Sequence, residues 1–86
     1  MKLMCVWSVA AENWKASVRR LQEADPKPER GVKVLGRWHE VGTGKGYTLL
    51  EVDDLVAVSR LSAQWSDLVD QKLVPVVDDD EIKKAL

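Results

Sequence analysis

The chain has 86 residues, with 13 basic and 14 acidic side chains that leave a net charge of −1 at pH 7. This length predicts one domain over residues 1–86, with a thin core, because so short a chain buries only about 60–65% of the surface that it exposes when unfolded. The basic residues are scattered, so we expect neither nucleic acid nor an anionic membrane as a partner.

The run KLMCVWS near the start is typical of a first strand. Leu3, Cys5 and Trp7 fall on one face, while Met4 and Val6 fall on the other. A strand that is apolar on both faces is expected to be covered on both faces. Cys5 is the only cysteine and cannot form a disulfide within the chain, which favours a reducing, cytoplasmic location.

A helix is predicted over residues 12–24. Trp14, Val18 and Leu21 follow the i, i+4, i+7 spacing of one helical stripe. The helix is expected to end near residue 24, because Pro26 disfavours helical backbone angles in the residue before it. The segment DPKPERG then reads as a solvated loop.

Two strands, VKVLGRWHEV and YTLLEV, flank the glycine-rich segment GTGKG. A phosphate-binding loop needs Ser or Thr after its lysine and then a helix, whereas Lys45 is followed by Gly46 and a strand. The segment therefore predicts a hairpin turn at residues 42–45, without nucleotide binding. With Thr43 and Gly44 at the centre of the turn, the two residue numbers of each cross-strand pair add up to 87.

That register assigns the side chains of the hairpin to two faces of a sheet. One face carries a carboxylate near two aromatic side chains and a glycine gap, which is how a small pocket with a polar anchor would look. Its members are Val34, Gly36, Trp38, Glu40, Tyr47, Leu49 and Glu51. The opposite face carries Leu35, Arg37, His39, Thr48, Leu50 and Val52.

The second helix and the fourth strand follow the hairpin. Asp53 and Asp54 offer an N-cap, and the helical stripe after them consists of Leu55, Val58, Leu61, Trp65 and Leu68.

The fourth strand, KLVPVV, contains Pro75, which donates no ladder hydrogen bond, so this strand should lie at a sheet edge. Residues 78–86 are expected to form a capped short helix or a tail. The element order is β-α-β-β-α-β.

The stretch WSDLVDQKLVPVV, residues 65–77, resembles the signature of a family of short bacterial proteins of unknown function. RWHE on the second strand and LLEVDD before the second helix resemble that family's Trp-x-Glu and Glu-x-Asp-Asp patterns. The resemblance covers nearly the whole chain. This chain departs from the family in its glycine-rich hairpin and in Trp7 and Trp14.

The resemblance implies an α+β, ferredoxin-like fold of the dimeric α+β barrel superfamily. It further implies a four-stranded antiparallel sheet with two helices on one face, and a homodimer in which two sheets pack face to face. Strands that are apolar on both faces agree with this arrangement, since the helices cover only one face. Relatives include cofactor-independent monooxygenases, haem-degrading enzymes and lactone isomerases, and the fold alone selects none of these activities.

Candidate site residues are few. Trp38, Tyr47 and Glu51 are predicted to share a face and to line a cavity that Trp65 of the second helix closes. Glu51 is the weak catalytic candidate, since a partly buried carboxylate with a raised pKa is suited to act as a base. His39 is the only histidine and suits neither a metal site nor haem ligation without further ligands, so we expect no metal and no cofactor.

Three functions remain open from the sequence. The first is a homodimeric protein that binds a small molecule in a pocket between sheet and helices. The second is a cofactor-independent monooxygenase or isomerase that uses Glu51 as a base. The third is a structural or partner-binding module without a ligand.

Overall fold

The computed structural model describes residues 1–24 and 30–86. It is an α+β domain, as predicted. The elements in chain order are β1 (Lys2–Val9), η1 (Ala11–Asn13), α1 (Trp14–Ala24), β2 (Val32–His39), β3 (Lys45–Val52), α2 (Leu55–Ala63), β4 (Val69–Val76), α3 (Asp79–Ile82) and η2 (Lys83–Ala85).

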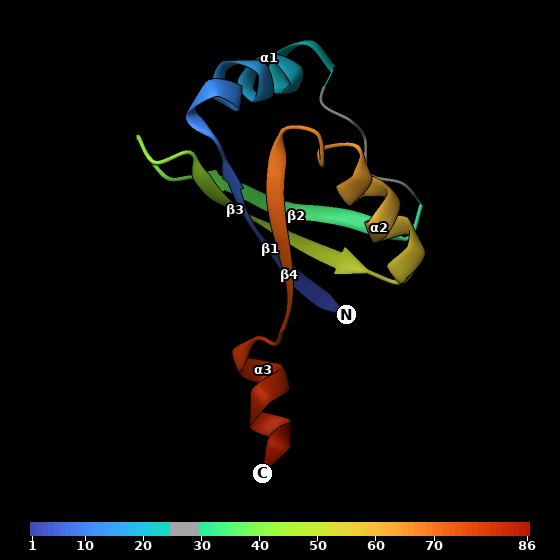
Figure 1. Cartoon of the computed structure of the whole chain (residues 1–86). Helices are drawn as coiled ribbons and strands as arrows, with labels where there is room; N and C mark the ends of the chain where they lie inside the picture. Colours follow the sequence, from blue (N-terminus) through green and yellow to red (C-terminus); the bar gives the residue numbers. More distant parts are fainter. Residues whose placement is uncertain (25–29) are drawn as a thin grey trace.

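The four strands form one antiparallel sheet in the order β2-β3-β1-β4 (Figure 1). This order confirms the ferredoxin-like fold. The edge position that Pro75 predicts is also confirmed, because β4 pairs with β1 alone. The strand begins at Val69, three residues before the predicted segment, and ends at Val76.

The core lies between the sheet and α2. Leu3, Leu50 and Val52 are buried against Ala57 and Val58, and Ala57 is completely inaccessible. Of the two aspartates predicted to cap α2, Asp54 is the N-cap. Its carboxylate accepts hydrogen bonds from the backbone N–H of Val56 at 2.9 Å and of Ala57 at 3.3 Å. This cap fixes the start of α2 and so places its apolar side over the sheet.

The first helix differs from its prediction. Residues 11–13 form a 3₁₀ turn, and the α-helix begins only at Trp14, whose side chain is 49% exposed. The predicted stripe is wrong at Trp14 and holds at Leu21, because the helix turns Ser17 and Leu21 toward the sheet. Ser17 tolerates burial since its hydroxyl donates to the Trp14 carbonyl at 2.8 Å. The helix ends at residue 24 as expected, and most of the predicted DPKPERG loop lies outside the described residues.

The hairpin between β2 and β3 is confirmed, but its predicted register is wrong. Trp38 pairs with Tyr47 and His39 with Gly46, so the paired numbers sum to 85 rather than 87. The loop is longer than predicted because both Gly42 and Gly44 adopt positive φ angles, 83° and 72°. The Gly44 carbonyl accepts a hydrogen bond from the Val9 N–H at 2.7 Å, which fixes the hairpin to the end of β1.

A register shift between Val34 and Gly36 changes the predicted faces of β2. Val34 pairs with Leu50 and therefore lies on the helix side of the sheet, not on the side of Trp38. An extra residue in one strand of an antiparallel pair reverses the alternation beyond it. Leu35, at the shift, is paired with no residue of β3. The other face assignments of the hairpin are kept, since a register error of two residues leaves each side chain on its face.

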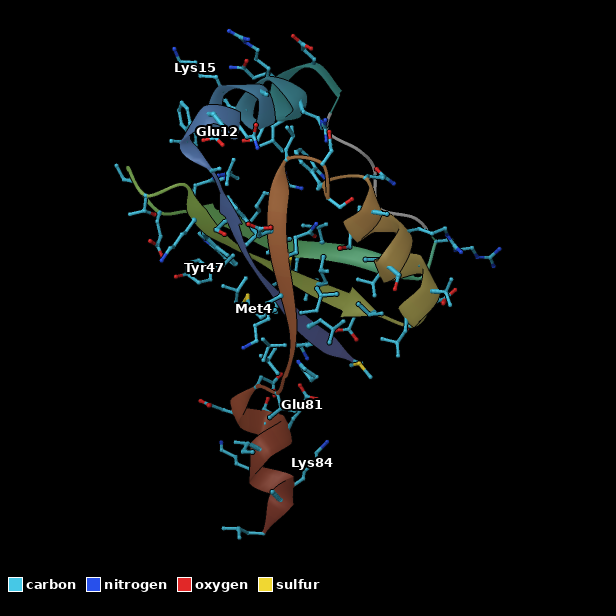
Figure 2. The ribbon with its side chains drawn as sticks, viewed as in Figure 1. Met4, Glu12, Lys15, Tyr47, Glu81 and Lys84 are labelled. Atoms are coloured by element: carbon cyan, nitrogen blue, oxygen red, sulfur yellow. The ribbon has the colours of Figure 1, made fainter. Side chains whose placement is uncertain are left out.

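The C-terminal segment forms a short capped helix that projects from the end of β4, away from α1 and α2 (Figures 1 and 2). Asp78 and Glu81 form a capping box, and the ammonium of Lys2 lies 2.8 Å from Glu81 and 3.4 Å from Asp78. Ile82 is 55% exposed. None of the helices in the described parts of the chain has the length and apolar character needed to span a membrane.

Acid should unwind α3 before it unfolds the sheet. The hydrogen bond from Lys2 lowers the pKa of Glu81, and the backbone N–H of Glu81 lowers the pKa of Asp78. Both carboxyls bind protons less tightly in the folded state, so their ionised forms stabilise α3. This stabilisation is fully present above the ordinary carboxyl pKa of about 4. It is lost as the pH falls through the lowered values. We expect the helical ¹³Cα shifts of residues 79–85 to disappear below about pH 4 while the β1–β3 amides keep their shifts.

A matched pair of variants checks the cause. Glu81→Gln should weaken α3 already at pH 7, whereas Asp80→Asn on the same turn should leave its acid response unchanged. Helical shifts that persist in the wild type at pH 2 would contradict this account.

Candidate functional site

A cavity of about 90 Å³ lies between the sheet and the two helices. Its floor is the helix-facing side of the sheet, where Trp7 and Thr48 meet from β1 and β3. Its walls include Leu21 of α1 and Leu61 of α2, and Trp65 after α2 contributes a further side. Apolar side chains thus enclose most of the space, with a small number of polar groups among them.

Two glycines leave room for two tryptophan rings. A Cβ atom at Gly46 would collide with the ring of Trp7 and would lie 2.5 Å from the carbonyl oxygen of Trp38. A Cβ atom at Gly36 would lie 2.8 Å from Cζ2 of the Trp38 ring, on the opposite face. Gly46, which directly follows the predicted turn, lies in β3 and makes space for a ring that lines the cavity.

The polar groups of the floor hold one another in fixed positions. The indole N–H of Trp7 donates to the Thr48 hydroxyl at 3.2 Å, and the Trp7 and His39 rings meet edge to face with centroids 5.0 Å apart. At the β4 side, the Gln71 amide donates to the Ser62 carbonyl at 2.9 Å. Every buried side-chain nitrogen or oxygen in the described chain has a partner, so the cavity surface is preorganised rather than strained.

Cys5 lines the cavity but is a poor nucleophile. Its side chain is buried, its thiol lies 3.8 Å from the Gln71 carbonyl oxygen, and burial raises the pKa of the thiol above its usual value. Because the thiolate is the reactive form, the neutral thiol acts here as a small apolar side chain.

Arg20 connects α1 to the turn that carries Trp65. Its guanidinium makes a two-pronged ion pair with Asp67, at 2.8 and 2.7 Å, and donates to the Gln64 carbonyl at 2.9 Å. The same group lies over the Trp65 ring, 5.3 Å from its centroid. The hydrogen bonds from Arg20 lower the pKa of Asp67, so this ion pair holds the Trp65 wall across the neutral pH range.

The structure separates the four predicted site residues into three places. Trp38 and Tyr47 are cross-strand neighbours on the sheet face that the helices leave open. Glu51 lies on this same face but four residues further along β3, roughly 13 Å from Tyr47 at ~3.4 Å per residue. Its side chain is 41% exposed, and its carboxylate pairs with the N-terminal ammonium at 3.2 Å.

Trp65 lies on the other side of the sheet from these three residues, where it lines the cavity. It therefore does not close a site formed by Trp38 and Tyr47 within one chain. The ligand-binding role of each of the four residues, and the use of Glu51 as a base, stay predictions.

Glu40 is a residue of the open face that the sequence places beside Tyr47 without assigning it a role. Its carboxylate accepts a short hydrogen bond from the Tyr47 hydroxyl and another from the Thr43 hydroxyl, at 2.8 Å. These bonds, that of Tyr47 above all, lower the pKa of Glu40, and the same contact raises the pKa of Tyr47. Glu40 is thus an ionised carboxylate that orients Tyr47.

Met4 and Val6 continue the open face onto β1, where Leu49 and Tyr47 are their neighbours on β3. Figure 2 shows Met4 and Tyr47 on the side of the sheet away from α2. Tyr47 and Val6 are each 37% exposed and Trp38 is 55% exposed. Within the described residues, no three His, Cys, Asp or Glu side chains gather in a geometry that would hold a metal ion.

We predict that Gly46→Ala displaces the Trp7 ring and distorts the cavity. The added methyl group has no free space, so we expect a loss of about 1–3 kcal/mol in the free energy of unfolding. Urea titration measures this loss, and the indole N–H resonance of Trp7 reports the ring. Gly36→Ala is the matched control, because it should move the Trp38 indole resonance while leaving that of Trp7 in place. An unchanged Trp7 resonance in Gly46→Ala would disprove the role of this glycine.

The family model for DUF3303, a domain of unknown function, matches residues 1–86, which is the whole chain. No curated protein and no solved structure shows a significant match to it.

Proposed function

The chain belongs to the DUF3303 family, whose function is unknown, and we propose that it is a homodimeric protein that binds a small molecule between its sheet and helices. The cavity carries this proposal. Its walls are largely apolar, and the hydroxyl of Thr48 and the amide of Gln71 lie among them. Ligand sites of small molecules combine apolar walls with a few placed polar groups in this way.

The volume of the cavity limits the ligand. At about 90 Å³ it is smaller than the ~150 Å³ that a benzene-sized guest occupies in a protein interior. The usual pockets for drug-sized ligands measure ~300–1,000 Å³. A ligand with a few non-hydrogen atoms in the cavity, or a larger one that extends through the mouth, matches this space.

The open face of the sheet supports the homodimer. Met4, Val6, Trp38, Tyr47, Leu49, Val74 and Val76 share this face by the strand registers. Four strands of eight residues span about 19 Å by 26 Å, on the order of 500 Å². A stable interface buries about 800 Å² per partner, so this face supplies most of what a dimer needs.

The charges of the open face favour a second copy over other occupants. Lys33 and Lys72 lie on this face together with Glu51 and Asp70, so both signs occur around the apolar centre. In a two-fold symmetric dimer, the open face of one subunit packs against the open face of the other. Because this face carries both basic and acidic side chains, opposite charges meet across the interface. A membrane or nucleic acid would instead require an excess of positive charge.

A cytoplasmic location belongs to the same proposal. Cys5 is a free, buried thiol, and the chain has no second cysteine with which to form a bridge. This usage is typical of proteins from reducing compartments.

Two serines of α2 give a matched test of the cavity. Ser62 lines the cavity, whereas Ser59, three residues earlier, is exposed. A library of fragments with up to about eight non-hydrogen atoms, screened by ¹⁵N–¹H spectra, should give hits with Kd near millimolar. Ser62→Leu should fill the space and abolish the hits, and Ser59→Leu should keep them.

Native mass spectrometry of freshly purified protein complements the screen by detecting a retained ligand. Binding would be assigned elsewhere, and the proposal rejected, if Ser62→Leu bound the same fragments with unchanged affinity.

Two valines give the corresponding test of the dimer. The wild type should sediment at equilibrium, at micromolar concentration, with twice the mass of one 9.7 kDa chain. Val6→Glu places a charge at the centre of the open face and should give monomers, because burying an unpaired carboxylate is strongly unfavourable. Val56→Glu, at a 61% exposed position on α2, should remain dimeric. A folded wild-type chain that sediments at 9.7 kDa would refute the dimer.

A further inference from the structure

We propose that α3 is an arm that packs against the partner subunit of the homodimer, with Ile82 as its central apolar contact. This inference rests on the proposed function, since it needs the homodimer, and it adds a second contact region to the open face of the sheet. The occupant that we assign to the exposed surface of α3 is thus a second copy of this chain.

The C-terminal helical segment stands apart from the rest of the domain. Figure 1 shows α3 beyond the end of β4, away from α1 and α2. No residue of α3 or of η2, both of which the structure describes in full, is buried. The segment therefore contributes nothing to the core of its own chain, which lies between the sheet and α2.

Lys2 holds α3 at the border of the open face. It lies two residues before Met4 on β1, and so on the same side of the sheet. Its ammonium lies 2.8 Å from the carboxylate of Glu81. Figure 2 shows Glu81 at the end of the helical segment nearest the sheet, with Lys84 further out. The arm thus starts beside the surface on which the partner is proposed to pack.

Three large aliphatic side chains of this short segment lie at the surface. Val77 is 56% exposed, Ile82 is 55% exposed and Leu86 is fully exposed. Single exposed apolar residues are normal, whereas a concentration of them is typical of an interaction surface. Isolated helices shorter than about 12–15 residues are also marginal in water. Packing against another surface covers the aliphatic side chains and stabilises α3 at the same time.

The area of the open face favours a second copy as that surface. The face measures on the order of 500 Å², whereas a stable interface buries about 800 Å² per partner. The sheet alone therefore leaves about 300 Å² per subunit to be supplied from elsewhere. A buried aliphatic side chain contributes roughly 100 Å². Val77, Ile82 and Leu86 together supply an area of the required size.

The length of the arm matches the geometry of two packed sheets. The helical residues 79–85 span about 10 Å at 1.5 Å rise per residue, and sheets packed face to face lie about 10 Å apart. An arm that starts at the border of one sheet therefore reaches the other subunit. Two-fold symmetry gives both subunits the same contact, so each arm packs on the partner of its own chain.

Isotope-filtered NOE spectra test the contact directly. A dimer mixed from ¹³C-labelled and unlabelled full-length chains gives filtered NOEs only between subunits. We expect such NOEs from the methyl groups of Ile82 to protons of the unlabelled partner. The methyl groups of Val56, which is 61% exposed on α2, are the control and should give none. Methyl NOEs of Ile82 that all arise within one chain would overturn the arm.

Substitutions at the same two positions measure what the contact contributes. Ile82 lies outside the core, so Ile82→Ser should leave the domain folded and raise the Kd of the dimer about tenfold, as sedimentation equilibrium over a dilution series measures. Ile82→Leu keeps an aliphatic side chain and should have a Kd within about twofold of the wild type. Val56→Ser is the matched control and should leave the Kd unchanged.

The results distinguish the arm from the dimer. A Kd that is the same in Ile82→Ser and in the wild type would overturn the arm and leave the homodimer, with the open face as its interface. A folded wild-type chain that sediments at 9.7 kDa would overturn the homodimer and the arm together.

Discussion

Two helices cover one face of a four-stranded sheet and no more, and much of this molecule follows from that constraint. β1 is apolar on both faces, and α2 buries only the set that includes Leu3. The side of the sheet that faces the helices forms the core. The cavity lies on the same side, between the sheet and the two helices. The other side keeps Met4, Val6 and Trp38 at the surface, so the same strand that builds the core also carries an apolar face outward.

The aromatic side chains divide between the faces by the same rule. Trp7 lies on the helix side over Gly46, and Trp38 lies on the open side over Gly36. The Trp7 ring thus occupies the space that Gly46 leaves on the neighbouring strand β3. The Trp38 ring occupies the space that Gly36 leaves two residues earlier on β2. This arrangement makes the glycines of the hairpin region part of the packing, in addition to the turn itself, where Gly42 and Gly44 supply positive φ angles.

The parts of the fold that depend on local chemistry could be predicted from the sequence. Asp54 caps α2, Pro75 lies on an edge strand, and the glycine-rich segment is a hairpin. The register shift in β2 could not be predicted, because Val34 and Leu35 are both apolar and the pattern gives no sign that Leu35 is an extra residue. A shift of this kind depends on tertiary packing rather than on local preference.

The candidate site was harder to predict for a related reason. Alternation in the hairpin correctly places Trp38 and Tyr47 on one face, but it does not say which face the helices cover. The sequence therefore groups Trp65 with the wrong face, and the helical stripe predicted to carry it is too long, because α2 ends at Ala63. Arg37 and His39 line the cavity and flank Trp38 in the sequence. Because successive side chains of a strand point to opposite faces, both lie on the face opposite to Trp38. Alternation therefore identifies them as soon as the covered face is known.

The central place of β1 also decides the order in which the sheet is assembled. Lys2 pairs with Glu51 on one side and with Val76 on the other, so both ladders of β1 join distant parts of the chain. Contacts of high sequence separation slow folding, whereas the hairpin of β2 and β3 closes locally. During synthesis, β1 emerges first with an apolar surface and two unpaired edges, and its second edge stays open until β4 has left the ribosome. The strand that is made first is thus among the last to be fully paired.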